Sequence, residues 1–236
     1  MFPLRDNVPK RRFPAVTLAI IFLNILVFLQ ELKLGRHLGP FMVQYALIPA
    51  RYMRPDEAAM LFGPFQNLGA ALLPFFSSMF LHGGWLHLIG NMWAFWIFGD
   101  SVEGRIGPGR FTALYLTSGV AAGLLHVFTN PHSEVPTLGA SGAIAGVMGA
   151  YFRFFPGAKV ETLVPPFFFG PIFVLPAVVF LGLWFLLQFF NGVLTLGTGN
   201  NFGGVAWWAH VGGFLFGLAV CLFASRKRAP PRITEI

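Results

Sequence analysis

Residues 139–155 read GASGAIAGVMGAYFRFF, a short apolar stretch in which a serine stands among glycines and alanines. Pro156 and Gly157 follow directly, so a helix that begins at Ser141 has about 15 residues. At about 1.5 Å per residue such a helix covers roughly 22 Å, less than the roughly 30 Å of a bilayer's hydrocarbon core. Non-helical backbone at 137–140 must complete the span, and irregular backbone at that depth is tolerated only inside protein or beside a water-filled cavity. We therefore expect Ser141 to lie below the outer membrane surface, next to water.

The rest of the chain has the composition of a polytopic membrane protein. Of its 236 residues, 56% are hydrophobic and only 11% are charged, and the mean hydropathy is +0.68, which is atypical of a soluble globular domain. Apolar runs that can form spanning helices lie at 14–32, 85–99, 110–129, 140–155, 171–191 and 204–224. The first run is too long for the apolar region of a signal peptide and no Ala-x-Ala site follows it, which indicates a retained helix. The sequence thus predicts an all-α membrane protein with one six-helix domain over residues 14–224.

The positive charges indicate how the chain is oriented. Of the 16 lysines and arginines, 12 fall on one side of the predicted helices, and the other four lie in one long loop: Lys33, Arg36, Arg51 and Arg54. By the positive-inside rule both termini, with basic segments at 1–13 and 225–236, are expected in the cytoplasm. Because these bases flank apolar helices, anionic lipid headgroups are the expected counter-charge and nucleic acid is not an expected partner. We expect a multi-pass protein of a prokaryotic cell membrane.

A loop of about 50 residues separates the first two predicted helices. Loops of that length usually have structure of their own. This one combines Phe, Leu and Met with sparse charge, which is typical of an element lying in the outer membrane interface. We expect a partly helical loop, with a plain connector as the alternative.

Two polar residues stand inside predicted membrane segments, Ser141 in the fourth and His210 in the sixth. A hydroxyl or an imidazole in hydrocarbon carries a desolvation penalty unless it finds a partner. Each is the obvious partner of the other, and a serine beside a histidine is the arrangement of a nucleophile with its general base. The alternative is ordinary helix packing in which His210 is satisfied by a different neighbour.

Small residues recur at four-residue spacing in the same two segments. The stripes are Gly142, Gly146 and Ala150 in the fourth segment, and Ala209, Gly213 and Gly217 in the sixth. Such stripes let helix backbones approach closely in lipid, which would bring the serine and the histidine together.

The second predicted helix adds candidate hydrogen-bond donors. His87 and Asn91 are four residues apart and share one helical face. A serine protease needs donors already in place for the oxyanion of its tetrahedral intermediate, and Asn91, His87 and the backbone N–H of Ser141 fit that role. His82 lies at the outer boundary, where it is expected to line the access of water. Structural hydrogen bonds between helices are the alternative for these residues.

Other polar residues predict less. A metal site built from His82, His87 and His210 is not expected, because the first two are five apart without a nearby carboxylate, and the single Cys221 excludes a thiolate cage. No cofactor is expected either. The remaining histidines, at 37, 126 and 132, predict surface or interfacial roles. The charged residues after position 99, among them Asp100 and Glu103, are expected to tie a tight loop together.

Taken together these residues resemble the rhomboid family of intramembrane serine proteases. The matching motifs, in order, are His82 with His87-x-x-x-Asn91, Glu103-x-x-x-Gly107, Gly139-Ala140-Ser141-Gly142, and Ala209-His210-x-Gly212-Gly213-x-x-x-Gly217. The resemblance extends over about residues 14–224.

The resemblance implies a six-helix bundle in which Ser141 attacks a peptide carbonyl and His210 accepts its proton. Gly139, Ala140 and Gly142 would support the backbone around the nucleophile. The implied substrate is a single-pass transmembrane helix that enters from the lipid and is cut near its outer end. No metal is implied.

The chain departs from the family pattern at two places. Leu73-Pro74 stands where many relatives have a Trp-Arg pair, which puts the docking of the long loop in doubt. Ala145 stands where some relatives have a tyrosine that stacks on the catalytic histidine. We therefore expect His210 to be oriented by another partner, from the fifth helix or a water.

The sequence therefore predicts an intramembrane serine endopeptidase that acts through an acyl-enzyme. The alternative is a non-proteolytic membrane protein, either a rhomboid-like chaperone or binding protein or a small transporter. The presence of both Ser141 and His210 favours the protease, since a protein that only binds can lose either. A transporter of the common kinds would show an internal repeat, and the sequence shows none.

Overall fold

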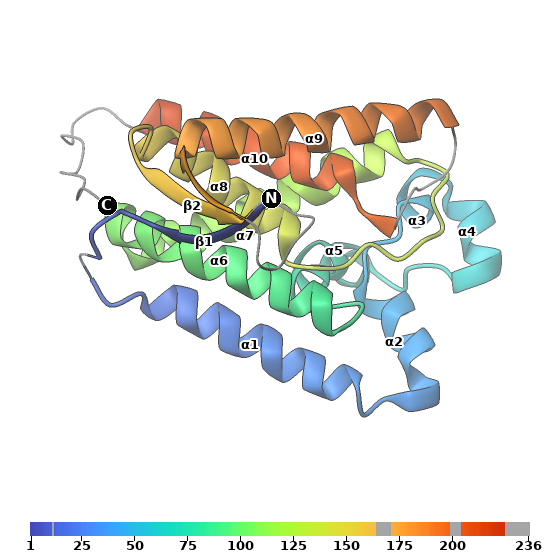
Figure 1. The fold of residues 1–236 in the computed structure, drawn as a ribbon. Coiled ribbons are helices and arrows are strands. Elements are labelled where there is room, and N and C mark those ends of the chain that lie inside the picture. Colours follow the sequence, from blue (N-terminus) through green and yellow to red (C-terminus); the bar gives the residue numbers. More distant parts are fainter. Residues whose placement is uncertain (11, 164–170, 199–203, 225–236) are drawn as a thin grey trace.

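The computed structural model describes residues 1–10, 12–163, 171–198 and 204–224. Six long helices form a bundle, with shorter helices gathered at one end of it (Figure 1). The six are α1 (Ala15–Glu31), α6 (Trp85–Ile106), α7 (Pro108–Thr129), α8 (Ser141–Phe154), α9 (Ala177–Thr198) and α10 (Trp207–Ala224). They follow the six predicted segments in order, which confirms a helical membrane bundle.

Length and hydropathy support fewer than six spans. In the described part of the chain, α7 and residues Ala177–Leu196 of α9 are each long and apolar enough to cross a membrane. Two further spans are possible if each of two bent helix pairs counts as one span. The first pair is Ala15–Glu31 with Gly35–Tyr45, and the second is Leu68–Phe80 with Trp85–Ile106. Helix α10 is apolar but shorter, and α8 has only 14 residues. The count of six spans stays a prediction.

Helix α8 runs through the centre of the bundle, and its residues from Gly142 to Tyr151 are all buried. It packs against α10 with almost no side chain between the two backbones. A β-carbon added at Gly217 would overlap the carbonyl oxygen of Gly146, and one added at Gly213 would overlap that of Gly142. Small residues at these positions let the two helices approach closely, so the beginning of α8 lies beside the beginning of α10.

Most of the long loop between α1 and α6 is helical, in agreement with the expected partly helical loop. It contains α2 (Leu38–Tyr45), α3 (Ala50–Met53), α4 (Pro55–Phe62) and α5 (Leu68–Ser77), followed by a 3-10 turn at Ser78–Phe80.

The loop docks without the Trp-Arg pair that the sequence lacks at 73–74. Within the loop, the guanidinium of Arg51 donates to the Val43 carbonyl at 2.7 Å. Leu47 exchanges two backbone hydrogen bonds, of 3.0 and 2.8 Å, with Thr137 in the segment that precedes α8. These contacts hold the loop over the end of the bundle at which α8 begins.

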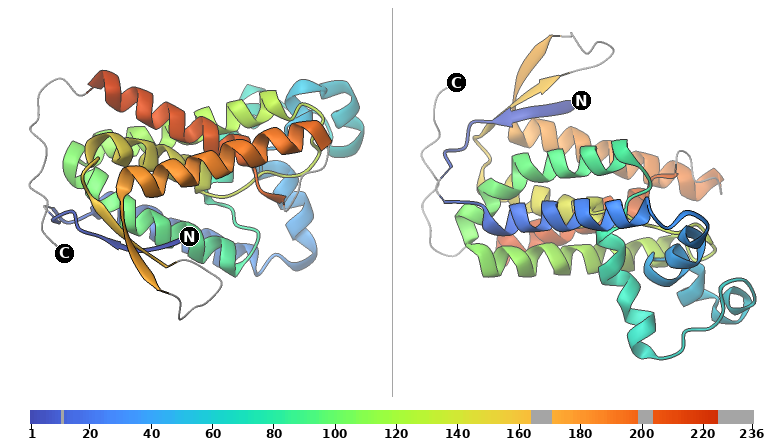
Figure 2. Two further views of the ribbon diagram at one scale, coloured as in Figure 1. Left: turned by 45° about the horizontal axis from the view of Figure 1, so that its top comes forward. Right: turned by 90° about the horizontal axis from the view of Figure 1, so that it is seen from below.

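A three-stranded antiparallel sheet beside the helices departs from the prediction (Figure 2). Its strands lie in the order β1 (Phe2–Asp6), β2 (Lys159–Leu163) and β3 (Ile172–Pro176). The N-terminal basic segment is therefore partly a strand, and the fifth helix begins at residue 177 instead of 171. The apolar run at 171–191 conceals this boundary, because a short apolar strand and the start of a buried helix have the same composition.

The expectation of a tight loop after position 99 is wrong. Helix α6 continues through Asp100 and Glu103 to Ile106, and only Gly107, with φ +85°, separates it from α7. Composition suggested a loop because charged residues are rare inside membrane helices, but here the last turns of α6 carry them.

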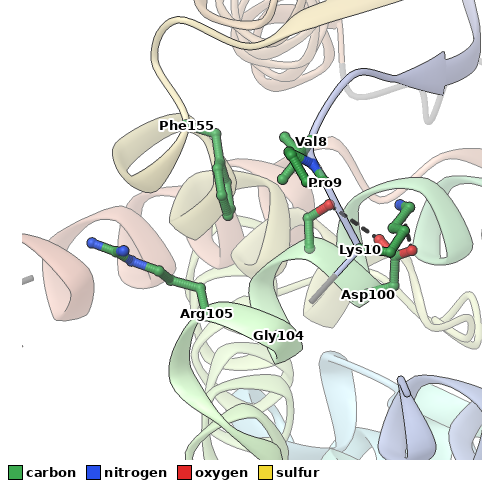
Figure 3. A pocket seen from close by; sticks show the side chains of 8 residues that line it. Val8, Pro9, Lys10, Asp100, Gly104, Arg105 and Phe155 are labelled. Atoms are coloured by element: carbon green, nitrogen blue, oxygen red, sulfur yellow. Dashed lines mark hydrogen bonds and ion pairs between the residues drawn. The ribbon is translucent and has the colours of Figure 1, made fainter. Parts of the chain in front are cut away.

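Those last turns of α6 hold the N-terminal segment in place. Lys10 forms ion pairs with Asp100, drawn in Figure 3, and with Asp6, whose carboxylate also accepts from the hydroxyls of Ser101 and Tyr151. A cavity of about 10 Å³ beside this cluster has room for no more than one water. The cluster is therefore a packed anchor for the N-terminal segment and too small for a ligand.

Candidate active site

The first residue of α8 and a residue in the first turn of α10 meet at the centre of the bundle. His210 Nε2 lies 2.8 Å from Ser141 Oγ. The two helices are fixed relative to each other by their glycine contacts, so the backbone sets this distance. For the serine hydroxyl to donate to Nε2, that nitrogen must carry no hydrogen, so the ring hydrogen would have to be on Nδ1.

The other ring nitrogen of His210 contacts the fifth long helix. Nδ1 lies 2.8 Å from Oε1 of Gln188, a buried residue of α9. One helical turn earlier, the Trp184 ring lies against the imidazole, with ring centroids 5.8 Å apart and planes inclined by 34°. Helix α9 thus supplies the partner that the absence of a tyrosine at position 145 led us to expect.

Sequence reasoning pointed to the fifth helix but missed Gln188 itself. The available signal is that Gln188 follows an uninterrupted apolar run from residue 177, and an amide in such a run needs a partner. Its direction could not be read from the sequence, because the face that α9 turns towards α10 depends on how the helices pack.

Two predicted residues of the second long helix lie near the serine. His87 and Asn91 line the same cavity as Ser141. The Gly83 N–H donates to His87 Nδ1 at 3.4 Å, so a neutral His87 carries its hydrogen on Nε2. A β-carbon at Gly139 would come within 2.7 Å of that nitrogen, and φ of Gly139 is +117°. Only glycine lets the backbone before the nucleophile pass this close.

His82 does not line the access of water, contrary to expectation. It is only 2% exposed, and its Nε2 lies 3.0 Å from Nδ2 of Asn91. The backbone N–H of His82 is in turn 3.2 Å from a carboxylate oxygen of Glu31, at the end of α1. His82 therefore stands behind Asn91 and holds its amide. The sequence placed His82 correctly before the helix, but the burial comes from α1 packing over it.

The cavity at the site has a volume of about 550 Å³. The residues that line it include Ser141, His210, His87, Asn91 and Gly83, together with residues 133, 135–138 and 204–206. This size and the few convergent polar groups are typical of a binding site for a peptide or a small molecule.

His126 also lines this cavity, which the sequence analysis missed. We expected a surface or interfacial role, but the side chain is 6% exposed, and its Nδ1 lies 3.2 Å from Nδ2 of Asn130. Its position near the end of α7 is as predicted, but its burial depends on how α7 packs in the bundle, which the sequence does not reveal.

No group of three or more histidine, cysteine, aspartate or glutamate residues could hold a metal ion within the described ranges. The arrangement that these ranges do contain is a hydroxyl, an imidazole that can accept its proton, and further polar groups around one cavity. Those groups can perform acyl transfer.

The fold and the site define a helical integral membrane protein in which a half-buried serine is hydrogen-bonded to a histidine. Sequence comparisons identify its family. The family model described as Rhomboid domain matches residues 69–227, and the chain belongs to the rhomboid family. The match includes every motif residue from His82 to Gly217.

The relatives include mitochondrial and bacterial rhomboid proteins. The chain is 30% identical over 153 residues to Rhomboid protein 1, mitochondrial, of Saccharomyces cerevisiae, covering 63% of this chain and 41% of that protein. It is 34% identical over 152 residues to Presenilin-associated rhomboid-like protein A, mitochondrial, of Danio rerio, covering 62% and 36%. It is 41% identical over 70 residues to Rhomboid protease GluP of Bacillus subtilis, covering 30% and 13%. The chain thus spans less than half the length of these relatives, and they do not favour the predicted prokaryotic membrane.

Proposed function

We propose that this protein is an intramembrane serine endopeptidase. The observation that carries the proposal is the hydrogen bond of 2.8 Å between Ser141 Oγ and His210 Nε2, beside a cavity that His87 and Asn91 also line. A non-proteolytic chaperone, binding protein or transporter does not need a nucleophile aligned with a base, so this bond favours the protease among the alternatives.

The reaction takes two half-steps. Ser141 Oγ attacks the carbonyl carbon of the scissile peptide while His210 Nε2 takes the hydroxyl proton, and the same proton passes to the leaving amine as the C–N bond breaks. Water then attacks the acyl-enzyme, with His210 again accepting a proton and returning it to Ser141. The products are a carboxylic acid and an amine.

The negative charge of each tetrahedral intermediate needs donors on the cavity wall. The backbone N–H of Ser141, the amide of Asn91 and Nε2–H of His87 are our candidates. The hydrogen bond between Asn91 and His82, and the bond from Gly83 to His87, support donors that are oriented before substrate binds.

The proposed substrate is a single-pass membrane protein cut near the outer end of its helix. A helix hides its carbonyl groups in its own hydrogen bonds, so it must unwind before Ser141 can attack. The asymmetry of basic residues supports cytoplasmic termini, and α1 begins at the end of the bundle at which α10 ends (Figure 1).

The test uses the full chain in detergent with a transmembrane reporter protein. Ser141→Ala and His210→Ala are expected to abolish cleavage, Asn91→Ala to reduce it roughly 100-fold or more, and chelators to leave it unchanged. His132→Ala, at an exposed position outside the cavity lining, is the matched control for His210→Ala and should cleave normally. Undiminished cleavage by Ser141→Ala would rule out the assignment. A fluorophosphonate should label the wild type and not the His210→Ala protein.

A further inference from the structure

We infer that Gln188 is a positioning residue for His210, which it holds in the tautomer that can accept the Ser141 proton. The inference rests on the proposed function and deepens it. Instead of a serine and a histidine acting alone, the site is then a relay of Ser141, His210 and Gln188, the last of these from a third helix.

The geometry selects one tautomer. A glutamine side-chain oxygen can only accept hydrogen bonds, so the contact of 2.8 Å between Oε1 of Gln188 and Nδ1 of His210 requires the ring hydrogen to be on Nδ1. Nε2 is then left with its lone pair, 2.8 Å from the Ser141 hydroxyl. Were the amide turned over, its NH2 would donate to Nδ1, the hydrogen would move to Nε2, and Nε2 could no longer accept the serine proton.

Two contacts from α9 fix the ring in space. Gln188 and Trp184 are four residues apart and so lie on one face of the helix. Gln188 holds the edge of the imidazole, and Trp184 lies against its face at 5.8 Å between ring centroids. Together they restrict rotation of the His210 side chain, which keeps Nε2 directed at Ser141.

A neutral partner suits this place better than an acid. Gln188 is 7% exposed, and a carboxylate so deeply buried would carry a large desolvation cost, whereas an amide satisfied by hydrogen bonds does not. The titratable side chains that act electrostatically on His210 in the described ranges are His87 of α6 and His126 of α7, neither of which can supply a negative charge. When His210 becomes protonated during the reaction, the dipole of the Gln188 carbonyl remains against Nδ1–H and stabilises the cation.

Kinetics of three variants test the inference. Gln188→Leu removes the acceptor at similar volume and is expected to lower kcat about 10- to 100-fold with little change in KM. Gln188→Glu keeps a side-chain oxygen beside Nδ1 and should retain more cleavage than Gln188→Leu. Asn191→Leu is the matched control: this amide, one turn further along α9, donates to the Leu187 carbonyl of its own helix, and its loss should leave kcat unchanged.

A measurement without catalysis separates this inference from the proposed function. Histidine labelled with ¹⁵N distinguishes a ring protonated at Nδ1 from one protonated at Nε2, and the His210 signals are assigned by their loss in His210→Ala. We expect Nδ1–H in the wild type and in Ser141→Ala, and a mixture of tautomers in Gln188→Leu. Unchanged tautomer or unchanged kcat in a folded Gln188→Leu protein would overturn the role of Gln188. Normal cleavage by Ser141→Ala would instead overturn the protease and leave the tautomer result standing.

Discussion

The carboxylate of Glu103, in the last turns of α6, accepts hydrogen bonds from both the backbone N–H and the hydroxyl of Thr17, at 2.8 and 2.7 Å. Its other oxygen accepts from the N–H of Val16 at 2.9 Å. The first N–H groups of a helix have no partner within it, and Pro14 at the N-cap of α1 offers no side-chain acceptor. Glu103 therefore caps α1 from another helix and fastens the two together.

Removing this cap should destabilise the bundle. Glu103→Ala leaves three donors without their acceptor and is expected to cost about 2–4 kcal/mol, because hydrogen bonds to charged groups are the strong ones. Thr17→Val removes only the hydroxyl and should cost about 1 kcal/mol. Thermal unfolding in detergent measures both. Equal midpoints for Glu103→Ala and the wild type would contradict the capping role.

Because glycines bring the backbones of α8 and α10 into contact, adding a single methyl group there should lower both stability and activity. In Gly217→Ala the new methyl meets the Gly146 carbonyl, so the helices must separate, at an expected cost of about 1–3 kcal/mol. The same separation would part Ser141 from His210. Gly182→Ala in α9 is the control, because a β-carbon there has nothing within 4 Å. Unfolding midpoints and reporter cleavage should fall for the first variant only.

Gly139→Ala should damage catalysis more than stability. The added methyl would press on the His87 ring, and a φ of +117° is strained for alanine, so the wall of the proposed oxyanion site must shift. We expect cleavage at least about tenfold slower. Gly90→Ala, next to Asn91 on α6 and exposed, is the control: a β-carbon there has nothing within 4 Å, and the rate should stay within about twofold of the wild type. Similar rates for the two variants would refute this prediction.

The pairing of β1 with β2 should depend on pH through Glu161. Arg5 donates two hydrogen bonds to this carboxylate, of 2.8 and 2.7 Å, and thereby holds the pKa of Glu161 below its ordinary value near 4.5. Because the pKa of Glu161 is lower in the folded protein than in the unfolded one, its ionised carboxylate stabilises the folded state at pH values above the ordinary pKa. This stabilisation is lost as the pH falls through the pKa of the folded state. Near pH 6, the β1 amides of the wild type should therefore exchange hydrogen more slowly than those of Glu161→Gln.

The difference between those two proteins should vanish at lower pH. Comparing them isolates Glu161, because Asp6 and Asp100 are present in both. A difference in β1 protection that persists well below pH 4 would show that another interaction is responsible.

Much of the bundle could be predicted from apolar runs alone. The predicted ranges 14–32, 110–129 and 204–224 agree with α1, α7 and α10 to within three residues, because lipid requires long apolar helices with few exceptions. The sheet could not be predicted, since Arg5 pairs with Glu161, 156 positions later, and no local pattern encodes such a partner.

Two residues of the candidate site could be predicted from residue type alone. Ser141 and His210 stand out because each is polar in an apolar run, and the glycine stripes beside them indicate that they meet. The burial of His82 and the direction of Gln188 depend instead on which face each helix turns inward. That face is set by packing among α1, α6, α9 and α10, which hydropathy does not reveal.

The contact between α8 and α10 constrains how this chain can evolve. At an ordinary core position a mutation can shrink or enlarge the side chain, and a neighbour can compensate by changing in the opposite direction. At Gly217 every alternative amino acid is larger, and the atom it would meet belongs to the main chain of Gly146, which no substitution can trim. No second substitution can therefore make room for a larger residue at this position. Lineages that keep the two helices in this contact must keep the glycine, even where the rest of the sequence diverges.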